Sequence, residues 1–109
     1  MKLVTLLLLL FTSETSTATQ TTIEIKAKRF EFAPNVVHLK KGEPVTITLT
    51  STDHSHGLLM KPLQIDLDAA EGRPDSVTIT PVQAGTFNAI CDHYCGSGHG
   101  NMKLTFVVE

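Results

Sequence analysis

The stretch "TFNAICDHYCGSGHGNMKLTFVVE", residues 86–109, contains two alternating apolar segments separated by a glycine-rich loop. A period of two is the pattern of half-buried β-strands. The positions that this alternation turns inward are Phe87, Ala89, Cys91, Leu104, Phe106 and Val108. The stretch therefore predicts two adjacent core strands joined by a loop over residues 92–102.

The rest of the chain repeats this pattern in short segments. Alternation with β-branched residues recurs in "TIEIKAKRF" (22–30), "VTITLTS" (45–51) and "SVTIT" (76–80). Turn residues separate these segments, namely Gly42, Pro44, Gly72, Pro74 and Gly85. No segment shows a helical period. The predicted fold is all-β, a Greek-key β-sandwich of seven to eight strands.

The first twenty residues resemble an export signal. Lys2 precedes an apolar run over residues 3–11, and small polar residues follow. A spanning helix needs about 20 apolar residues. We expect a signal peptide over residues 1–18 and a mature domain over residues 19–109, in the periplasm or another extracytoplasmic space. The alternative is an uncleaved segment that serves as a membrane anchor.

Length and charge limit the classes of function. The chain has 109 residues and a net charge of −2, which is typical of a single small domain. No basic patch indicates nucleic acid. No constellation indicates a general base or a substrate pocket, so we expect neither catalytic residues nor a small-molecule substrate.

The loop is dense in soft metal donors: Cys91, Cys95, His99 and Met102 follow one another within twelve residues. Thiolate, thioether and imidazole suit copper, and a weak axial methionine is typical of electron-transfer copper sites. Three alternatives remain at this level. They are a disulfide between the two cysteines, a structural zinc site, and a mononuclear copper site that uses one cysteine.

One loop rarely supplies a full ligand set, so we expect a second histidine from elsewhere. The segment "TSTDHSHGLLM", residues 50–60, offers two candidates after a predicted core strand. His56 is the preferred ligand and His54 is its rival. Asp53 is either a supporting group for the site or an ordinary turn residue.

Together these motifs resemble a known family. The pattern C-x3-C-G-x2-H-x2-M in "CDHYCGSGHGNM" (91–102) resembles the binuclear copper loop of cytochrome c oxidase subunit II, and nitrous oxide reductase has a similar spacing. The segment at 50–60 resembles the upstream part of that subunit, where an aspartate precedes the first histidine ligand by three positions. This register selects His56. Residues 30–53 are similar to the opening strands of cupredoxins, and the resemblance covers roughly residues 21–109.

The resemblance implies a binuclear copper centre, called CuA, in a cupredoxin-like sandwich. The thiolates of the two cysteines would bridge two copper ions, and each histidine imidazole would bind one ion. A methionine sulfur and a backbone carbonyl would be weak axial donors. The implied ligands are His56, Cys91, Cys95, His99, Met102 and, through its carbonyl, His93.

The implied function is single-electron transfer between redox proteins such as a cytochrome c or a haem–copper oxidase, without catalysis by the chain itself. Membrane contact is expected only through such a partner or through an uncleaved N-terminus. The alternative function is copper delivery, as a periplasmic chaperone or metallation factor that uses the same donors.

Overall fold

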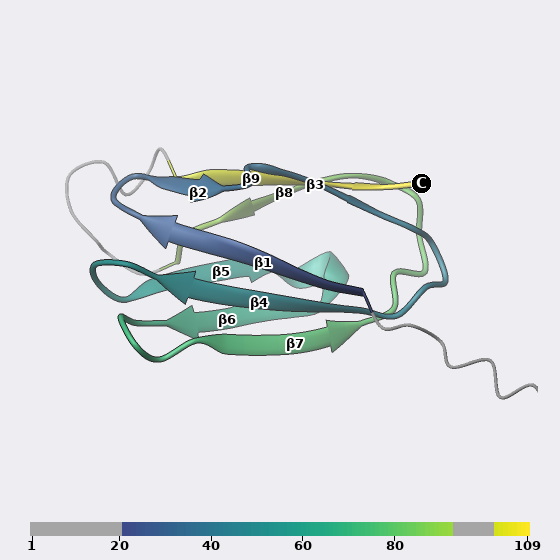
Figure 1. Ribbon diagram of the computed structural model, residues 1–109. Coiled ribbons are helices and arrows are strands. Elements are labelled where there is room, and N and C mark those ends of the chain that lie inside the picture. Colours follow the sequence, from purple (N-terminus) through teal and green to yellow (C-terminus); the bar gives the residue numbers. More distant parts are fainter. Residues whose placement is uncertain (1–20, 93–101) are drawn as a thin grey trace, which may run out of the picture.

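The computed structural model describes residues 21–92 and 102–109 of the chain. They form nine β-strands and one short 3₁₀ helix, arranged as two packed layers (Figure 1). The elements are β1 (Thr21–Lys28), β2 (Glu31–Ala33), β3 (Val36–Leu39), β4 (Val45–Ser51), β5 (His56–Met60), η1 (Lys61–Leu63), β6 (Ile65–Ala69), β7 (Asp75–Ile79), β8 (Gly85–Ile90) and β9 (Lys103–Val108).

The strands divide into two sheets. One has the order β2-β1-β4-β7 and the other the order β3-β9-β8-β5-β6. The pairs β1–β4 and β3–β9 are parallel, and the other pairs are antiparallel. The chain crosses repeatedly between the sheets, as in the predicted β-sandwich. The all-β class is therefore confirmed.

The strand count exceeds the seven to eight expected, because nine strands lie within the described residues. β2 has three residues, too few to show a period of two. β5 is buried at four of its five positions and so shows no alternation in sequence. A strand that is buried on both faces has a continuous apolar sequence. Periodicity alone cannot identify such a segment as a strand.

The core lies between the sheets and includes most of the predicted inward positions. The residues of the opening stretch that are buried there are Ala89, Cys91, Leu104, Phe106 and Val108. From the other predicted strands the buried residues are Ile25, Ala27, Val45, Ile47, Leu49 and Ile79. Ile23, Val77 and Phe87 are partly buried and pack against this cluster. Alternation in the sequence thus predicted which faces meet.

Four strands run toward the same end of the sandwich. The β1–β2 turn, the β4–β5 loop and the β6–β7 loop all lie there, on the left of Figure 1, and β8 also ends there. This ligand end is where the candidate site is built. Among the described residues no helix is long and apolar enough to cross a membrane.

The turn between β3 and β4 depends on one glycine. Gly42 has φ of 81°, and its N–H donates to the Pro81 carbonyl at 2.7 Å. A β-carbon there would meet nothing within 4 Å, so a substitution acts through backbone strain alone. We expect Gly42→Ala to lower the free energy of unfolding by about 1–2 kcal/mol, measured by urea denaturation.

Gly42→Asn is the matched control, because asparagine tolerates this left-handed conformation better than alanine does. It should recover part of the loss. Equal stability of the alanine variant and the parent protein would show that the turn does not require a positive φ.

Candidate metal centre

Three of the predicted ligands lie in the described residues, and the strands bring all three to the ligand end. His56 is the first residue of β5, Cys91 follows β8 and Met102 precedes β9. Strand β8 pairs antiparallel with both β5 and β9, so the start of β5 and the start of β9 lie beside the end of β8. The three side chains are 0%, 3% and 1% exposed.

The other three predicted ligands, His93, Cys95 and His99, lie outside the described residues. The described part of the site is therefore an imidazole, a thiol and a thioether. All are buried at one end of the five-stranded sheet.

The His56 imidazole has one satisfied and one unsatisfied nitrogen. Nε2 lies 2.6 Å from Asp53 Oδ1. Nδ1 is buried and has no hydrogen-bond partner among the described residues. A buried polar atom without a partner costs about 1–3 kcal/mol, so a protein that keeps one usually has a use for it.

Asp53 accepts hydrogen bonds on both carboxylate oxygens. Arg29 N–H donates to Oδ2 at 2.8 Å, and His54 N–H donates to Oδ1 at 2.6 Å, beside the His56 contact. Burial raises the pKa of this carboxyl, but the hydrogen bonds from Arg29, His56 and His54 outweigh it and hold the pKa well below its usual range. Asp53 is therefore an ionised acceptor at neutral pH.

This geometry assigns the proton of the His56 ring. An ionised carboxylate only accepts hydrogen bonds, so Nε2 must be the protonated ring nitrogen, which donates to Asp53. In a neutral imidazole Nδ1 then carries a lone pair, which no donor among residues 21–92 and 102–109 occupies. A metal-bound histidine commonly donates its other N–H to a carboxylate in this way.

The described donors fit copper. An imidazole lone pair, a cysteine sulfur and a methionine sulfur are the ligand types of copper electron-transfer sites. Zinc would use the imidazole and the thiolate, but it has no use for the buried Met102 thioether.

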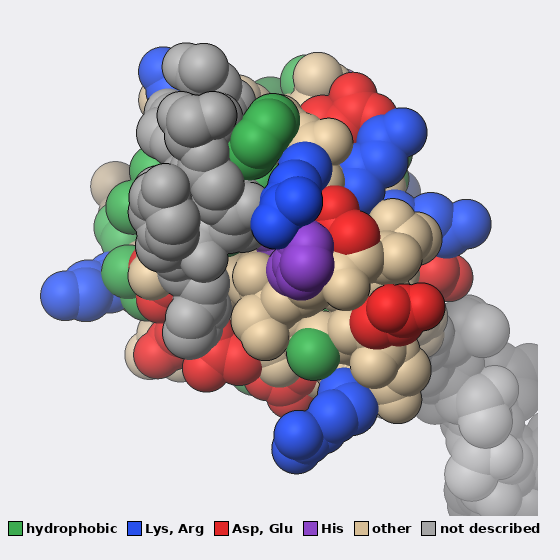
Figure 2. Space-filling view, turned by 90° about the vertical axis from the view of Figure 1, so that its left-hand side faces the viewer, with side chains coloured by type: hydrophobic (Ala, Val, Ile, Leu, Met, Phe, Trp, Pro, Cys, Tyr) green, Lys and Arg blue, Asp and Glu red, His purple; other side chains and the backbone are tan. Residues whose placement is uncertain are grey.

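His54, the rival of His56, is exposed at the ligand end. Figure 2 looks onto this end, where acidic and basic side chains lie around histidine and neither charge sign dominates. His54 lies in the loop before β5, whereas His56 begins the strand and turns into the core.

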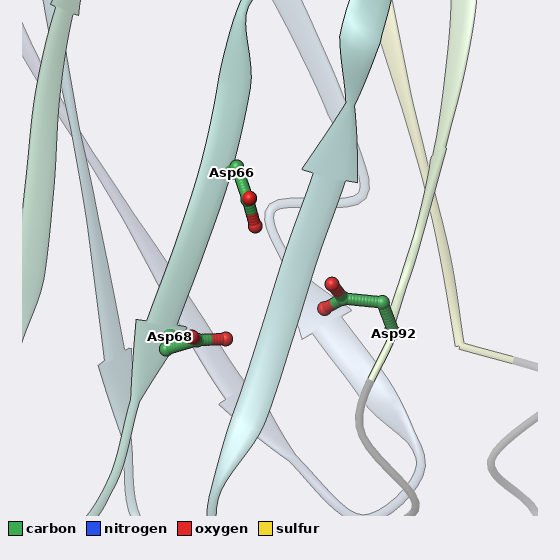
Figure 3. Close-up of side chains that lie close together, drawn as sticks. All are labelled: Asp66, Asp68 and Asp92. Carbon is green, nitrogen blue, oxygen red and sulfur yellow. The ribbon is translucent and has the colours of Figure 1, made fainter.

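A carboxylate cluster that the sequence did not reveal lies on the outer face of the five-stranded sheet. Among the described residues, Asp66, Asp68 and Asp92 have carboxylate oxygens within 4.8 Å of one another, and all three are exposed. Figure 3 shows Asp66 and Asp68 on β6 and Asp92 beyond the end of β8, with β5 passing between them. Oxygen donors suit hard cations rather than copper, so these residues are not part of the copper site.

The sequence matches a known family and known proteins. The family model of the cupredoxin-like domain matches residues 2–105. Cytochrome c oxidase subunit 2 of Thermus thermophilus is 32% identical over 90 residues, which cover 83% of this chain and 67% of that protein. Nitrous-oxide reductase of Cupriavidus necator is 28% identical over 92 residues, which cover 81% of this chain and 14% of the reductase.

Solved structures with a similar fold include a domain of an oxidase subunit II. The crystal structure of the periplasmic domain of subunit II of cytochrome oxidase from Bradyrhizobium japonicum matches with a TM-score of 0.75. The match covers 82% of this chain and 83% of that domain at 17% identity, so it concerns the fold alone. The chain spans only part of the longer curated relatives, 14% in the case of the reductase. From the family model and the oxidase relative together, the chain belongs to the cupredoxin-like domain family, as a homologue of cytochrome c oxidase subunit II and nitrous-oxide reductase.

Proposed function

We propose that this domain is an electron carrier that holds two copper ions in a binuclear CuA centre. The observation that carries the proposal is the buried Nδ1 of His56, which has no partner in the described part of the chain and lies at the same end of the sheet as the buried Cys91 and Met102. Homology to an oxidase subunit and a copper-type fold supports electron transfer as the class of function.

The side chains that would hold the metals have separate roles. Cys91 and Cys95 would hold both ions through their thiolates, His56 and His99 would each bind one ion, and Met102 would be a weak donor. The His93 carbonyl would be a second weak donor. The roles of His93, Cys95 and His99 rest on the sequence pattern, since they lie outside the described residues.

When bound, two copper ions held by soft sulfur and imidazole donors would supply single-electron transfer. The chain contributes a fixed and nearly dry end of a β-sandwich. Cys91 and Met102 extend two hydrogen-bonded core strands, so their positions are set by the sheet. His56 is held by Asp53.

We also propose the setting in which the domain acts. Residues 1–18 would direct export and residues 19–109 would form the domain, either released or anchored. A periplasmic location is supported by the structural relative, which is the periplasmic domain of an oxidase subunit. The partners would be redox proteins such as a cytochrome c or a haem–copper oxidase, and the domain itself would not catalyse a reaction.

Copper stoichiometry tests this proposal. We expect purified apo-protein reconstituted with copper to hold two ions per chain, measured by elemental analysis, and to exchange electrons rapidly with a reduced cytochrome c. One copper per chain would contradict the binuclear site. Bound zinc in preference to copper would contradict the electron-transfer role as well.

Copper delivery is the second candidate function, and exposed His54 beside buried His56 favours it. An exposed imidazole next to the site is a natural first ligand for copper that is passed to a partner. Rapid loss of copper to a competing chelator, together with slow electron exchange, would favour delivery over electron transfer. Retention of copper with rapid exchange would exclude it.

A further inference from the structure

We propose that Asp53 is the positioning residue of the copper site. Its carboxylate holds His56 in the Nε2–H tautomer and in one ring orientation before any metal binds. The inference rests on the proposed function only in naming His56 as a copper ligand. The state of the ring in the apo-protein is a separate and measurable property.

Both oxygens of the Asp53 carboxylate accept hydrogen bonds. Oδ1 accepts hydrogen bonds from His56 Nε2 and from the His54 N–H, each at 2.6 Å. Oδ2 receives the Arg29 N–H at 2.8 Å. A carboxylate with donors on both oxygens cannot rotate without losing one of them, so the oxygen that faces His56 is fixed in direction.

The backbone that carries Asp53 is held as well. The Ser51 hydroxyl accepts the Asp53 N–H at 3.3 Å and donates to the His54 carbonyl. Ser51 ends β4 and is itself buried. The loop between β4 and β5 is therefore closed by a small network of hydrogen bonds within the chain.

The network also joins the two sheets at the ligand end. Arg29 lies in the turn after β1, which belongs to the four-stranded sheet, whereas His56 begins β5 in the five-stranded sheet. Asp53 bonds to both. The orientation of one ligand is thus determined by contacts from both layers, and we infer that the imidazole is already in its binding orientation in the apo-protein.

Asp53→Asn is the most specific variant, because it keeps the shape of the side chain and removes one acceptor. An amide has a single acceptor oxygen, and its nitrogen only donates. If the amide nitrogen of the new side chain faces Arg29, two N–H donors point at each other, the amide and the Arg29 backbone N–H. If it faces His56, the amide donates to Nε2 and drives the ring proton to Nδ1, the nitrogen needed for the metal.

Nitrogen NMR of the apo-protein reads the tautomer of each histidine directly. We expect His56 in the parent protein to be the Nε2–H tautomer, and in Asp53→Asn to become the Nδ1–H tautomer or a mixture. Loss of a supporting carboxylate typically weakens metal binding by roughly 10–100-fold, and we expect a loss of that size in copper affinity. Asp66→Asn, an exposed carboxylate on β6, is the matched control and should change neither reading.

Two results would overturn the inference. One is an Nδ1–H tautomer of His56 in the parent apo-protein, a reading that needs no variant to fold. The other is a folded Asp53→Asn protein with the parent tautomer and the parent copper affinity. A parent protein with the expected tautomer that binds no copper would support the positioning role and contradict the proposed function, so the two claims fail separately.

Discussion

The Cys91→Ser variant should hold fewer than two copper ions per chain and should lose the spectrum of a shared electron. Serine offers a hard oxygen that stays protonated at neutral pH, whereas a bridging ligand to copper must be a soft thiolate. The side chain is 3% exposed and the two residues differ little in size, so the sandwich should fold. Elemental analysis and electron paramagnetic resonance (EPR) of the reconstituted variant measure the effect.

Met102→Leu is the matched control for this loss. Met102 is 1% exposed, and leucine conserves its volume, which typically costs less than about 1.5 kcal/mol. Because Met102 would be only a weak donor, its loss should leave two coppers bound and change the reduction potential. Two coppers and a shared electron in Cys91→Ser would remove the basis for a thiolate bridge at this position.

Phe106→Ala should cause the largest loss of stability, about 3–5 kcal/mol, the range typical of a phenylalanine truncated in a core. Phe106 is fully buried in β9, opposite Phe87 on β8 and beside Val37 on β3. Each kcal/mol lowers Tm by about 4–8 °C in a domain of this size, so the fall should exceed about 12 °C. Urea denaturation of the apo-protein gives the free energy.

Val82→Ala is the control for Phe106→Ala, because Val82 is 80% exposed. Its truncation should change stability by no more than about 0.5 kcal/mol. Similar losses in the two variants would mean that β9 is not the centre of the core.

Where each strand has one face in the core, alternation predicted the burial of the core positions from the sequence. It failed for β5, which is buried on both faces. Strand β6 alternates clearly, with Asp66 and Asp68 outward between buried apolar residues. Aspartate is depleted in strands, so the sequence of this segment does not predict a strand.

The choice between His54 and His56 shows what a pattern cannot decide. Both are at even positions, so alternation places them on the same face. The structure separates them because β5 begins at His56, while His54 remains in the loop and is exposed. The sequence segment alone favours His56 but leaves His54 as a rival, and the spacing from Asp53 in the family resemblance selects His56.

The contacts of Asp53 could not have been predicted from side-chain types. Its partner on Oδ2 is the backbone N–H of Arg29, which lies 24 residues earlier in the chain. Every residue except proline has such a group, so it leaves no trace in composition. It becomes a partner only when the β1–β2 turn and the β4–β5 loop meet at the ligand end.

The EPR spectrum of the oxidised, copper-loaded protein tests the central claim most directly. The account predicts hyperfine splitting from one unpaired electron shared equally by two copper nuclei, at two coppers per chain. A spectrum of one electron on one copper nucleus would contradict a binuclear centre built on His56 and Cys91.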